Sequence, residues 1–457
     1  MRAKILDLAI QGKLTDQREE DGNARDLLKE IQAEKEKLIK EQQIKKEKPL
    51  PEIEADEIPF EIPKNWMWAR WGTLSISIKY GYNTSAQKDG KIKMVRISDI
   101  QNNQVNWDSV PFCNIPKEEI TQYLLRKNDI LFARTGGTVG KSYLVSEVPE
   151  NVVYAGYLIR TRYSEKLSPQ YLKYFMESDL YWSQLKKGTT TTAQPNCNAK
   201  TLGKMVLPLP PLAEQKRIAD KVATLFAQLD AIDKAYEEYR ELQQTMKAKL
   251  LDLAVQGKLT DQRAEDGNAR DLLKEIQAEK EKLIKEKKIK KEKPLPEIEA
   301  DEIPFEIPKN WMWVRIGNIF TLQSGKSIKA NEISVKQYDE YRYPCFGGNG
   351  IRGYVKAFNR EGDYPIIGRQ GALCGNINFS SGKFYATEHA VVTDGYSKVN
   401  AYWAVIFLKA LNLNQYATAT AQPGLSVTKI NTVLIPLPPL AEQNRIVAKL
   451  DELLPLL

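Results

Sequence analysis

Apolar side chains recur at alternating steps of four and three residues through the middle of the chain. The positions in this seam are Ile218, Val222, Leu225, Leu229, Ile232, Tyr236, Tyr239, Gln243, Met246, Leu250 and Leu253. Residues 213–256 contain neither proline nor glycine. Such a seam is typical of a coiled coil rather than of a helix in an ordinary bundle. At ~1.5 Å per residue, this stretch predicts a single helix roughly 60 Å long.

Shorter patterns predict mixed α/β regions before and after that helix. Runs of β-branched and aromatic residues predict strands within 91–100, 129–135, 142–145 and 154–163, and again within 343–355, 364–379 and 383–392. Helical periodicity predicts helices over 169–187 and 400–413, and a highly charged amphipathic helix over 24–46. Four prolines between 49 and 63 predict an extended strap.

The chain repeats itself at its edges and not in its interiors. Residues 1–72 recur at 246–317, where only eight of the 72 positions differ. PLPPLAEQ at 208–215 returns unchanged at 436–443, so its offset is 228 residues rather than 245. The interiors, 73–190 and 318–418, do not align, although both end in a similar polar segment, TTTAQPNCN or TATAQPGLS. A repeated frame with two variable interiors predicts one scaffold that presents two specificities, with a shared fold in both interiors.

These boundaries predict five parts. They are an N-terminal helical repeat (1–71), a first variable domain (72–201), a central repeated region with the long helix (202–316), a second variable domain (317–424) and a C-terminal repeated helix (425–457). The C-terminal helix is interrupted by Pro455 well before it matches the whole central helix. We therefore expect both terminal helices to lie antiparallel to the central helix, and a partner subunit to cover the seam around 232–239.

Composition and charge limit the classes of function that this chain can have. No apolar run approaches the ~20 residues of a membrane span, and residues 1–16 lack the pattern of a signal peptide. The four cysteines show no CxxC spacing and there is one histidine, His389, which argues against a zinc site and for a reducing, cytoplasmic location. The net charge of +8 is the sum of +6 in residues 72–201, +4 in residues 317–424 and −2 in the rest of the chain. Basic, tyrosine-rich variable domains favour nucleic acid as the ligand, although tyrosine is also common in β-rich domains generally.

The repeated frame resembles the DNA-specificity subunit of type I restriction–modification enzymes. The resemblance rests on the two PLPPLAEQ segments, each followed by Arg-Ile two residues on, and on IPKNWMWARWG and IPKNWMWVRIG. Within the interiors, RISDI, ARTGGTVGKS, GNGIRGY, GRQGALCG and TEHAVV resemble segments of the family's target-recognition domains. The resemblance implies an α+β fold with two mixed α/β target-recognition domains. Long repeated helices would separate these domains and form an antiparallel coiled coil, in a pseudo-two-fold circular arrangement.

The resemblance also implies a function and partners. Each recognition domain would read one half of a split, asymmetric site in double-stranded DNA. Two modification subunits would dock on the frame helices and methylate adenine with S-adenosylmethionine, and restriction subunits would add ATP-driven translocation with Mg. No cofactor is expected on this chain. Two alternatives stay open: a specificity subunit of a solitary methyltransferase or another restriction class, and a stand-alone DNA-binding regulator.

The residues give separate reasons to expect no catalysis. TGGTVGKS at 135–142 fails as a phosphate-binding loop, because threonine stands where the first glycine of GxxxxGK[ST] is required. Neither PLPPL segment is preceded by the Asn or Asp of an adenine-methyltransferase motif, and His389 has no legible nucleophile partner. We therefore expect neither catalytic residues nor metal ligands on this chain.

Candidate DNA contacts are polar side chains in the loops of the two interiors, because bidentate base readout needs Arg, Lys, Asn or Gln. The candidates in the first interior are Tyr82, Asn83, Arg96, Ser98, Arg134, Thr135, Lys141 and Gln194. Those in the second are Lys326, Asn349, Arg352, Arg369, Gln370, His389 and Gln422. For any one of them, a phosphate contact or a structural role is more frequent than base readout.

Overall fold

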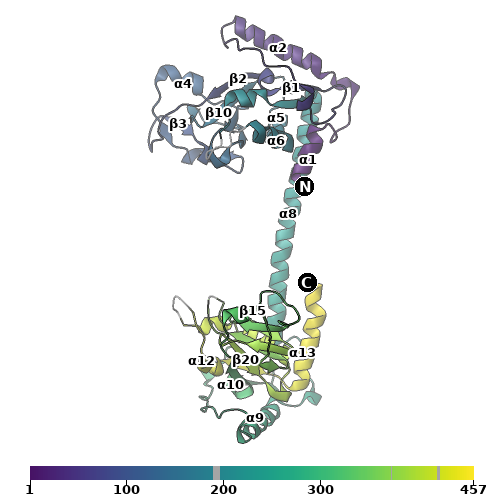
Figure 1. Cartoon of the computed structure of the whole chain (residues 1–457), viewed down its shortest axis with the longest axis vertical. Coiled ribbons are helices and arrows are strands. Elements are labelled where there is room, and N and C mark those ends of the chain that lie inside the picture. The colour runs from purple at the N-terminus through teal and green to yellow at the C-terminus, as the bar shows by residue number, and fades with distance from the viewer. Residues whose placement is uncertain (189–195, 372, 419–422) are drawn as a thin grey trace. The chain divides into compact units, whose positions relative to one another are not determined.

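The computed structural model describes residues 1–188, 196–371, 373–418 and 423–457. The chain divides into two compact units, Met1–Ala235 and Tyr236–Leu457. Figure 1 shows the elements of both units along the chain. Within the described residues, every helix is too short or too polar to cross a membrane.

The repeated sequence forms the same elements twice. In the first unit the frame comprises α1 (Arg2–Ile10), α2 (Ala24–Lys40), β1 (Met67–Arg70), α3 (Trp71–Leu74), α7 (Ala199–Lys204), β11 (Val206–Leu209) and the start of α8 (Leu212–Val255). In the second it comprises the end of α8, α9 (Ala269–Lys285), β12 (Met312–Arg315), α10 (Ile316–Ile319), α12 (Val427–Thr432), β21 (Leu434–Leu437) and α13 (Leu440–Leu453). β1 pairs with β11, and β12 with β21, in the same antiparallel register.

In the first unit, α1 runs antiparallel to the start of α8. Arg2 donates to Asp230 at 2.6 Å, whereas Gln17, beyond the other end of α1, donates to Glu214 at 2.7 Å. The Glu214 side chain is fully buried (0% exposed) and also accepts from the indole Nε1 of Trp66 at 2.7 Å. Burial raises the pKa of Glu214, and these donors oppose that shift by stabilising the carboxylate. The glutamate of the first PLPPLAEQ therefore fixes the strap to α8.

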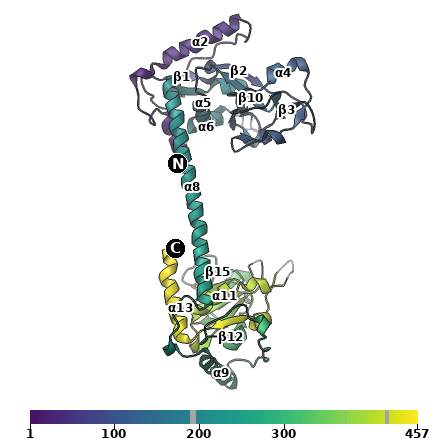
Figure 2. The same cartoon turned by 180° about the vertical axis from the view of Figure 1, so that it is seen from behind.

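The second unit repeats this arrangement. Gln262 and Trp311 donate to the buried Glu442 at 2.7 and 2.8 Å. Gln243 of α8 donates to the backbone carbonyl of the terminal residue, Leu457. α13 therefore runs antiparallel to the end of α8, and Figures 1 and 2 show each terminal helix beside α8 from two sides. The expected antiparallel placement of both terminal helices is confirmed within each unit.

The glutamine of PLPPLAEQ joins the frame to the interior. The Gln215 Oε1 accepts from the backbone N–H of Ser168 at 2.9 Å, and the Gln443 Oε1 accepts from that of Asn400 at 3.0 Å. Each glutamine is buried and donates to a carbonyl of its own PLPPL segment. Because Ser168 caps α5 (Pro169–Phe175) and Asn400 caps α11 (Ala401–Ala410), the same amide positions both variable domains on the frame.

The seam of α8 is covered at its ends and exposed in its middle. Ile218 and Val222 are buried in the core of the first unit, while Leu250 lies partly buried against that of the second. Between them, the apolar side chains are mostly exposed: Ile232 (63%), Tyr236 (59%), Tyr239 (54%), Leu242 (57%) and Met246 (44%). The heptad pattern predicted the helix to within one residue at each end, but the described helices of this chain cover it near its two ends and not in its middle.

Both interiors contain a four-stranded antiparallel sheet of the same order. In the first, it is built from β2 (Ser75–Tyr80), β10 (Leu158–Tyr163), β7 (Ile130–Ala133) and β8 (Ser142–Leu144). In the second, it is built from β13 (Thr321–Ser324), β20 (Ala390–Asp394), β17 (Tyr364–Gly368) and β18 (Ile377–Ser380). The two interiors therefore share a central fold despite their unlike sequences.

The remaining strands form smaller sheets and differ more. The first interior has β6 (Phe112–Cys113), β3 (Ile92–Val95) and β9 (Val152–Tyr154), with a β4–β5 hairpin (Ile100–Gln101, Gln104–Val105) and α4 (Lys117–Tyr123). The second has β15 (Gly350–Val355), β14 (Tyr343–Gly347), β19 (Lys383–Ala386) and β16 (Arg360–Glu361). Helices α5 (Pro169–Phe175) and α6 (Asp179–Gly188) follow the first set, and α11 (Ala401–Ala410) follows the second.

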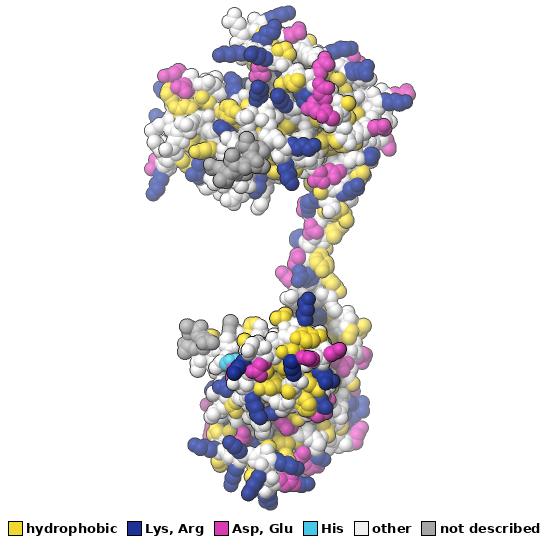
Figure 3. Space-filling model, in the orientation of Figure 1, with side chains coloured by type: hydrophobic (Ala, Val, Ile, Leu, Met, Phe, Trp, Pro, Cys, Tyr) yellow, Lys and Arg dark blue, Asp and Glu magenta, His cyan; other side chains and the backbone are white. Residues whose placement is uncertain are grey.

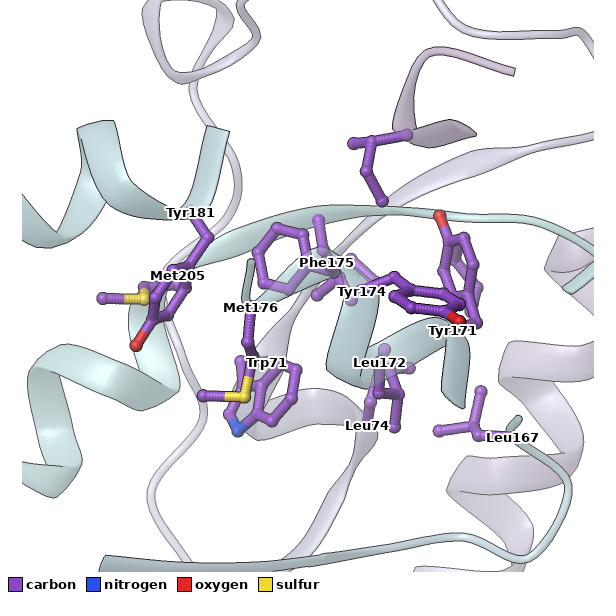
Figure 4. Packing of buried hydrophobic residues seen from close by; sticks show 14 of the residues in the cluster. Trp71, Leu74, Leu167, Tyr171, Leu172, Tyr174, Phe175, Met176, Tyr181 and Met205 are labelled. Atoms are coloured by element: carbon purple, nitrogen blue, oxygen red, sulfur yellow. The ribbon is translucent and has the colours of Figure 1, made fainter. Parts of the chain in front are cut away.

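The frame and the first interior share one hydrophobic core. Trp71, at the end of the first strap, packs against Phe175 with ring centroids 5.9 Å apart and donates to the Thr161 hydroxyl at 3.1 Å. Figure 4 shows Trp71 among Phe175, Met176 and Leu172. Its counterpart in the repeat is Ile316, one of the eight differences. This difference therefore falls where the frame meets two unlike interiors.

Two helix predictions were too long. The helix expected over 24–46 ends at Lys40, with Gln42 in the left-handed region (φ 59°), because the polar residues that follow have little apolar surface to bury. The helix expected over 169–187 is two helices, α5 and α6. Ser178 separates them: its hydroxyl donates to the Phe175 carbonyl and accepts from the Tyr181 N–H, which caps α6.

Candidate nucleic-acid interface

Three loops meet beside the four-stranded sheet of the first interior. At the end of β2, Gly81 donates to the carbonyl of Leu158 and Tyr82 donates to that of Tyr154. After β7, the backbone N–H of Arg134 donates to the carbonyl of Tyr157 at 3.1 Å. A Cβ on Gly81 would lie 2.2 Å from a backbone oxygen, so this approach requires glycine. The structure thus brings the candidates Tyr82 and Arg134 together.

The second interior has the same backbone arrangement with different side chains. Gly325 donates to the carbonyl of Ala390, Lys326 to that of Ala386, and Arg369 to that of His389. A Cβ on Gly325 would lie 2.0 Å from a backbone oxygen. The equivalent pairs are Tyr82 with Lys326, Arg134 with Arg369, Tyr157 with His389, and Thr135 with Gln370. Three candidates of the first interior are therefore structurally matched to candidates of the second, and a fourth candidate of the second, His389, is matched to Tyr157, although the two sequences do not align.

Arg134 and Arg369 share a feature that, among the described arginines, only Arg160 also has. Among the groups that the structure describes, the Nε atoms of Arg134 and Arg369 are buried and have no hydrogen-bond partner. The Arg134 guanidinium lies over the Tyr80 ring at 4.7 Å, and the Arg369 Nη1 donates to the Ser324 hydroxyl at 3.1 Å. A buried donor without a partner is costly, so a ligand that supplies an acceptor would be favoured there.

The loops of both arginines are tied to the polar segment that precedes α7 or α12. Thr135 forms a bridge with Asn196, and Gln370 forms one with Gly424. The carbonyl of Arg134 accepts from the N–H of Cys197 at 2.9 Å. Burial raises the pKa of the Cys197 thiol to about 11, so it stays protonated and unreactive at neutral pH. Candidates Gln194 and Gln422 lie outside the described residues.

The remaining candidates of the first interior lie apart from the arginine loop or at its edge. Arg96 is engaged by Asp99, to which its Nη2 donates at 2.7 Å, and this pair closes a short turn in which Ser98 is exposed. Lys141 is exposed and lines a cleft of about 510 Å³. Asn83 is exposed and packs over Gly156, next to Tyr157. Partial burial raises the pKa of the Tyr82 phenol, so it remains a neutral hydrogen-bonding group.

The second interior places its other candidates around the same loop. Asn349 is exposed and accepts from the Asn376 amide at 3.5 Å, while the stem of the exposed Arg352 lies over Gly347. The Nε2 of His389 lies 3.4 Å from the carboxylate of Glu388, and its Nδ1 is buried without a partner among the described groups. Figure 3 shows His389 at the surface of the second unit, with Lys or Arg side chains beside it.

Sequence reasoning missed two aromatic residues of this region. Tyr157 is 62% exposed and stands where the second unit has His389, and Tyr80 stacks on Arg134. Neither residue has a bidentate donor, and the local sequence does not distinguish either one from the other tyrosines of the first interior. A structural alignment of the turn before β10 with the turn before β20 identifies Tyr157 at once. No group of three or more His, Cys, Asp or Glu side chains with the geometry of a metal site occurs among the described residues.

Known proteins resemble the whole arrangement. A family profile described as "Type I restriction modification DNA specificity domain" matches residues 78–239 and 308–455. The specificity subunit of the Escherichia coli type I restriction enzyme EcoAI is 27% identical over 99% of this chain and 88% of its own length. The specificity subunit of EcoprrI is 48% identical over 30% of this chain and 34% of its own length. The specificity subunit of EcoEI is 30% identical over 70% of this chain and 61% of its own length.

Solved structures agree on the fold. The HsdS subunit from Thermoanaerobacter tengcongensis matches with a TM-score of 0.50 and 20% identity, over 86% of this chain and 90% of its own. A chain from a study of complex assembly and conformational transition in a type I R-M system matches with a TM-score of 0.52 and 21% identity, over 86% and 91%. The expected α+β fold, with two variable domains and a long helix, is confirmed. With the family profile matching both units, the chain belongs to the type I restriction–modification DNA specificity family.

Proposed function

We propose that this chain is the specificity subunit of a type I restriction–modification enzyme, with each variable domain reading one half of a split DNA site. The observation that carries the proposal is the matched pair Arg134 and Arg369. Each arginine lies in an equivalent loop of a different interior, with a buried Nε that lacks a partner among the described groups. Guanidinium is the usual reader of guanine in the major groove and also binds phosphate.

The side chains around each arginine supply the difference between the half-sites. Beside Arg134 are Tyr157 and Thr135, whereas beside Arg369 are His389 and Gln370. An amide can read adenine bidentately, which a threonine hydroxyl cannot. Two domains with the same backbone but different donors and acceptors would therefore select different sequences, which gives an asymmetric site.

The rest of the proposal concerns partners. Two modification subunits would carry S-adenosylmethionine and methylate adenine, and restriction subunits would bind ATP and Mg. The exposed apolar residues of α8 from Ile232 to Met246 support a partner subunit on that stretch, since soluble proteins seldom leave such a stripe in water. The chain itself acts as a non-catalytic DNA-binding subunit.

The function is tested by comparing the chain alone with the chain plus its modification subunits. The purified chain is expected to bind DNA weakly and to transfer no methyl group from S-adenosylmethionine, because its proposed role is binding. With the modification subunits added, adenine methylation should appear and follow one sequence. Tritium transfer to plasmid DNA measures both states. Methyl transfer by the pure chain would contradict the proposal.

Changing one arginine should weaken recognition of one half-site. Arg134→Gln is expected to reduce binding of the assembled enzyme to its site by roughly 10–100-fold, since a bidentate base contact contributes about 1–3 kcal/mol. Competition binding against DNA with either half-site scrambled measures the effect. The matched control is Lys166→Gln, which removes the same charge from the first unit at a side chain that bonds to Glu30 of the frame. Equal losses in both variants would mean that Arg134 contributes only its charge.

A further inference from the structure

The second unit contains an open groove of about 1060 Å³ where its frame meets the end of its interior. Leu251 and Val255 of α8 form one wall, and Trp313 and Leu434 form another. The third wall comes from the end of α11 and the short helical turn Leu413–Tyr416 that follows it. The walls are apolar, and the rim carries Asp252, Glu297, Glu299 and Glu302 with Lys429, while the buried Arg315 pairs with Glu302 at 2.7 Å.

In the first unit, α6 fills the equivalent space. The frame residues that correspond to Leu251, Val255 and Leu434 are Leu6, Ile10 and Val206, and α6 packs against α1. The Gln184 amide of α6 forms two bonds with one residue of β11: it accepts from the N–H and donates to the carbonyl of Val206, both at 2.8 Å. Figure 4 shows Tyr181 of α6 beside Met205, which precedes β11.

The second interior is four residues shorter over the equivalent stretch. Ser168 and Asn400 occupy equivalent positions on the frame, but 40 residues separate Ser168 from Pro208 and only 36 separate Asn400 from Pro436. After α11 the chain makes a single 3-10 turn in place of α6. The second unit therefore keeps the frame surface on which a helix packs, but none of its described residues forms a helix equivalent to α6.

The frame residues show what is left uncovered. Leu6 and Val206 are buried in the first unit (5% and 2% exposed), whereas their counterparts Leu251 and Leu434 are only partly buried. Leu434 lies opposite Arg315 in the register that places Val206 opposite Arg70. Its outward backbone N–H and C=O therefore face the groove, and no side chain of the described residues makes the pair of bonds that Gln184 makes with Val206.

We propose that this groove receives an amphipathic helix from another polypeptide, in the position that α6 occupies in the first unit. The helix would present an apolar side chain and a glutamine or asparagine four residues apart, as Leu180 and Gln184 are in α6. The amide would pair with the Leu434 backbone, and the apolar side chain would cover Leu251. The rim does not set the net charge of the helix, because α6 begins with Asp179 beside Asp7, the counterpart of Asp252, and ends in Lys186 and Lys187. This interaction is independent of DNA recognition.

The chain's own α6 supplies the probe, because the frame walls of the two grooves are nearly identical in sequence. A fluorescent peptide of residues 177–188 is locked as a helix by a lactam between Lys187 and a Ser183→Glu substitution, two positions that are exposed in the first unit. Locking removes the cost of forming a short helix. Fluorescence anisotropy with the intact chain should show saturable binding at one site.

Variants on both sides locate the binding. In the peptide, Gln184→Ala should weaken binding about tenfold, the effect of about 1.4 kcal/mol. In the protein, Leu251→Glu and Ala248→Glu should each weaken it at least tenfold; Ala248 lines the groove and is exposed, so that substitution spares the core. Leu242→Glu, on α8 outside the groove, is the control and should bind normally. No saturable binding, or equal binding by the wild type and Ala248→Glu, would overturn the proposal.

Discussion

Exchanging residues 73–190 for the first interior of another family member should change one half of the recognised DNA site and leave the other half unaltered. The reason is that each interior is held by its own copy of the frame, through Gln215 in the first unit and Gln443 in the second. Each mismatched base pair costs about 1–3 kcal/mol. A half-site of three base pairs therefore changes preference by roughly a hundredfold to a millionfold.

The exchanged segment must still pack on the hydrophobic core that the frame and the first interior share. Trp71 lies outside the exchanged segment but packs against Phe175 within it, so position 71 should be exchanged together with the donor interior. The matched control exchanges residues 318–418 together with position 316, the counterpart of Trp71. Methylated sites from both chimaeras, sequenced alongside the wild type, should differ in opposite halves. Changes in both halves from a single exchange would mean that the two domains do not read DNA independently.

Lengthening α8 should change the spacing between the half-sites and not their sequences. Seven residues inserted near Lys234 preserve the heptad phase and add ~10 Å to the helix. At about 3.4 Å per base pair, this equals roughly three base pairs and about a quarter turn of DNA or more. The variant is expected either to methylate sites with a longer spacer or to lose activity, because the boundary between the two units falls within α8.

Selection from a DNA library with randomised spacer length measures this effect. The control places the same seven residues after Lys290, in the exposed polar segment that follows α9. That variant should keep the original spacing, since its insertion does not lengthen α8. Full activity at the original spacing in the α8 variant would show that the helix does not set the distance.

Local patterns predicted the long elements well and the tertiary contacts poorly. The uninterrupted seam predicted α8 to within one residue at each end. The run contains neither proline nor glycine, and Pro211 and Gly257 mark its two ends. The break at Ser178 was missed because serine is tolerated within helices, and only the packing of Tyr181 and Phe175 shows why two helices are needed. The strand order β2-β10-β7-β8 joins strands far apart in the chain, and no local pattern carries that information.

The candidate interface shows the same limit. Arg134 and Arg369 could be chosen from residue type and from their place after a strand. Their equivalence could not be seen, because it depends on backbone bonds to Tyr157 and His389 that the unaligned interiors conceal. Arg96, chosen for the same reasons, is held by Asp99 in a turn. Residue type therefore suggests which side chains can bind DNA, while burial and existing hydrogen-bond partners show which of their donors lack a partner within the chain.

We propose that the chain directs methylation to a DNA site that is split between its two domains. This proposal is tested most directly by expressing the chain with its modification subunits in a host that lacks adenine methylation, and then mapping every methylated adenine in the genome. We expect one asymmetric motif made of two specified parts separated by a spacer of fixed length and arbitrary sequence. A continuous motif, or methylation without sequence preference, would contradict the proposal.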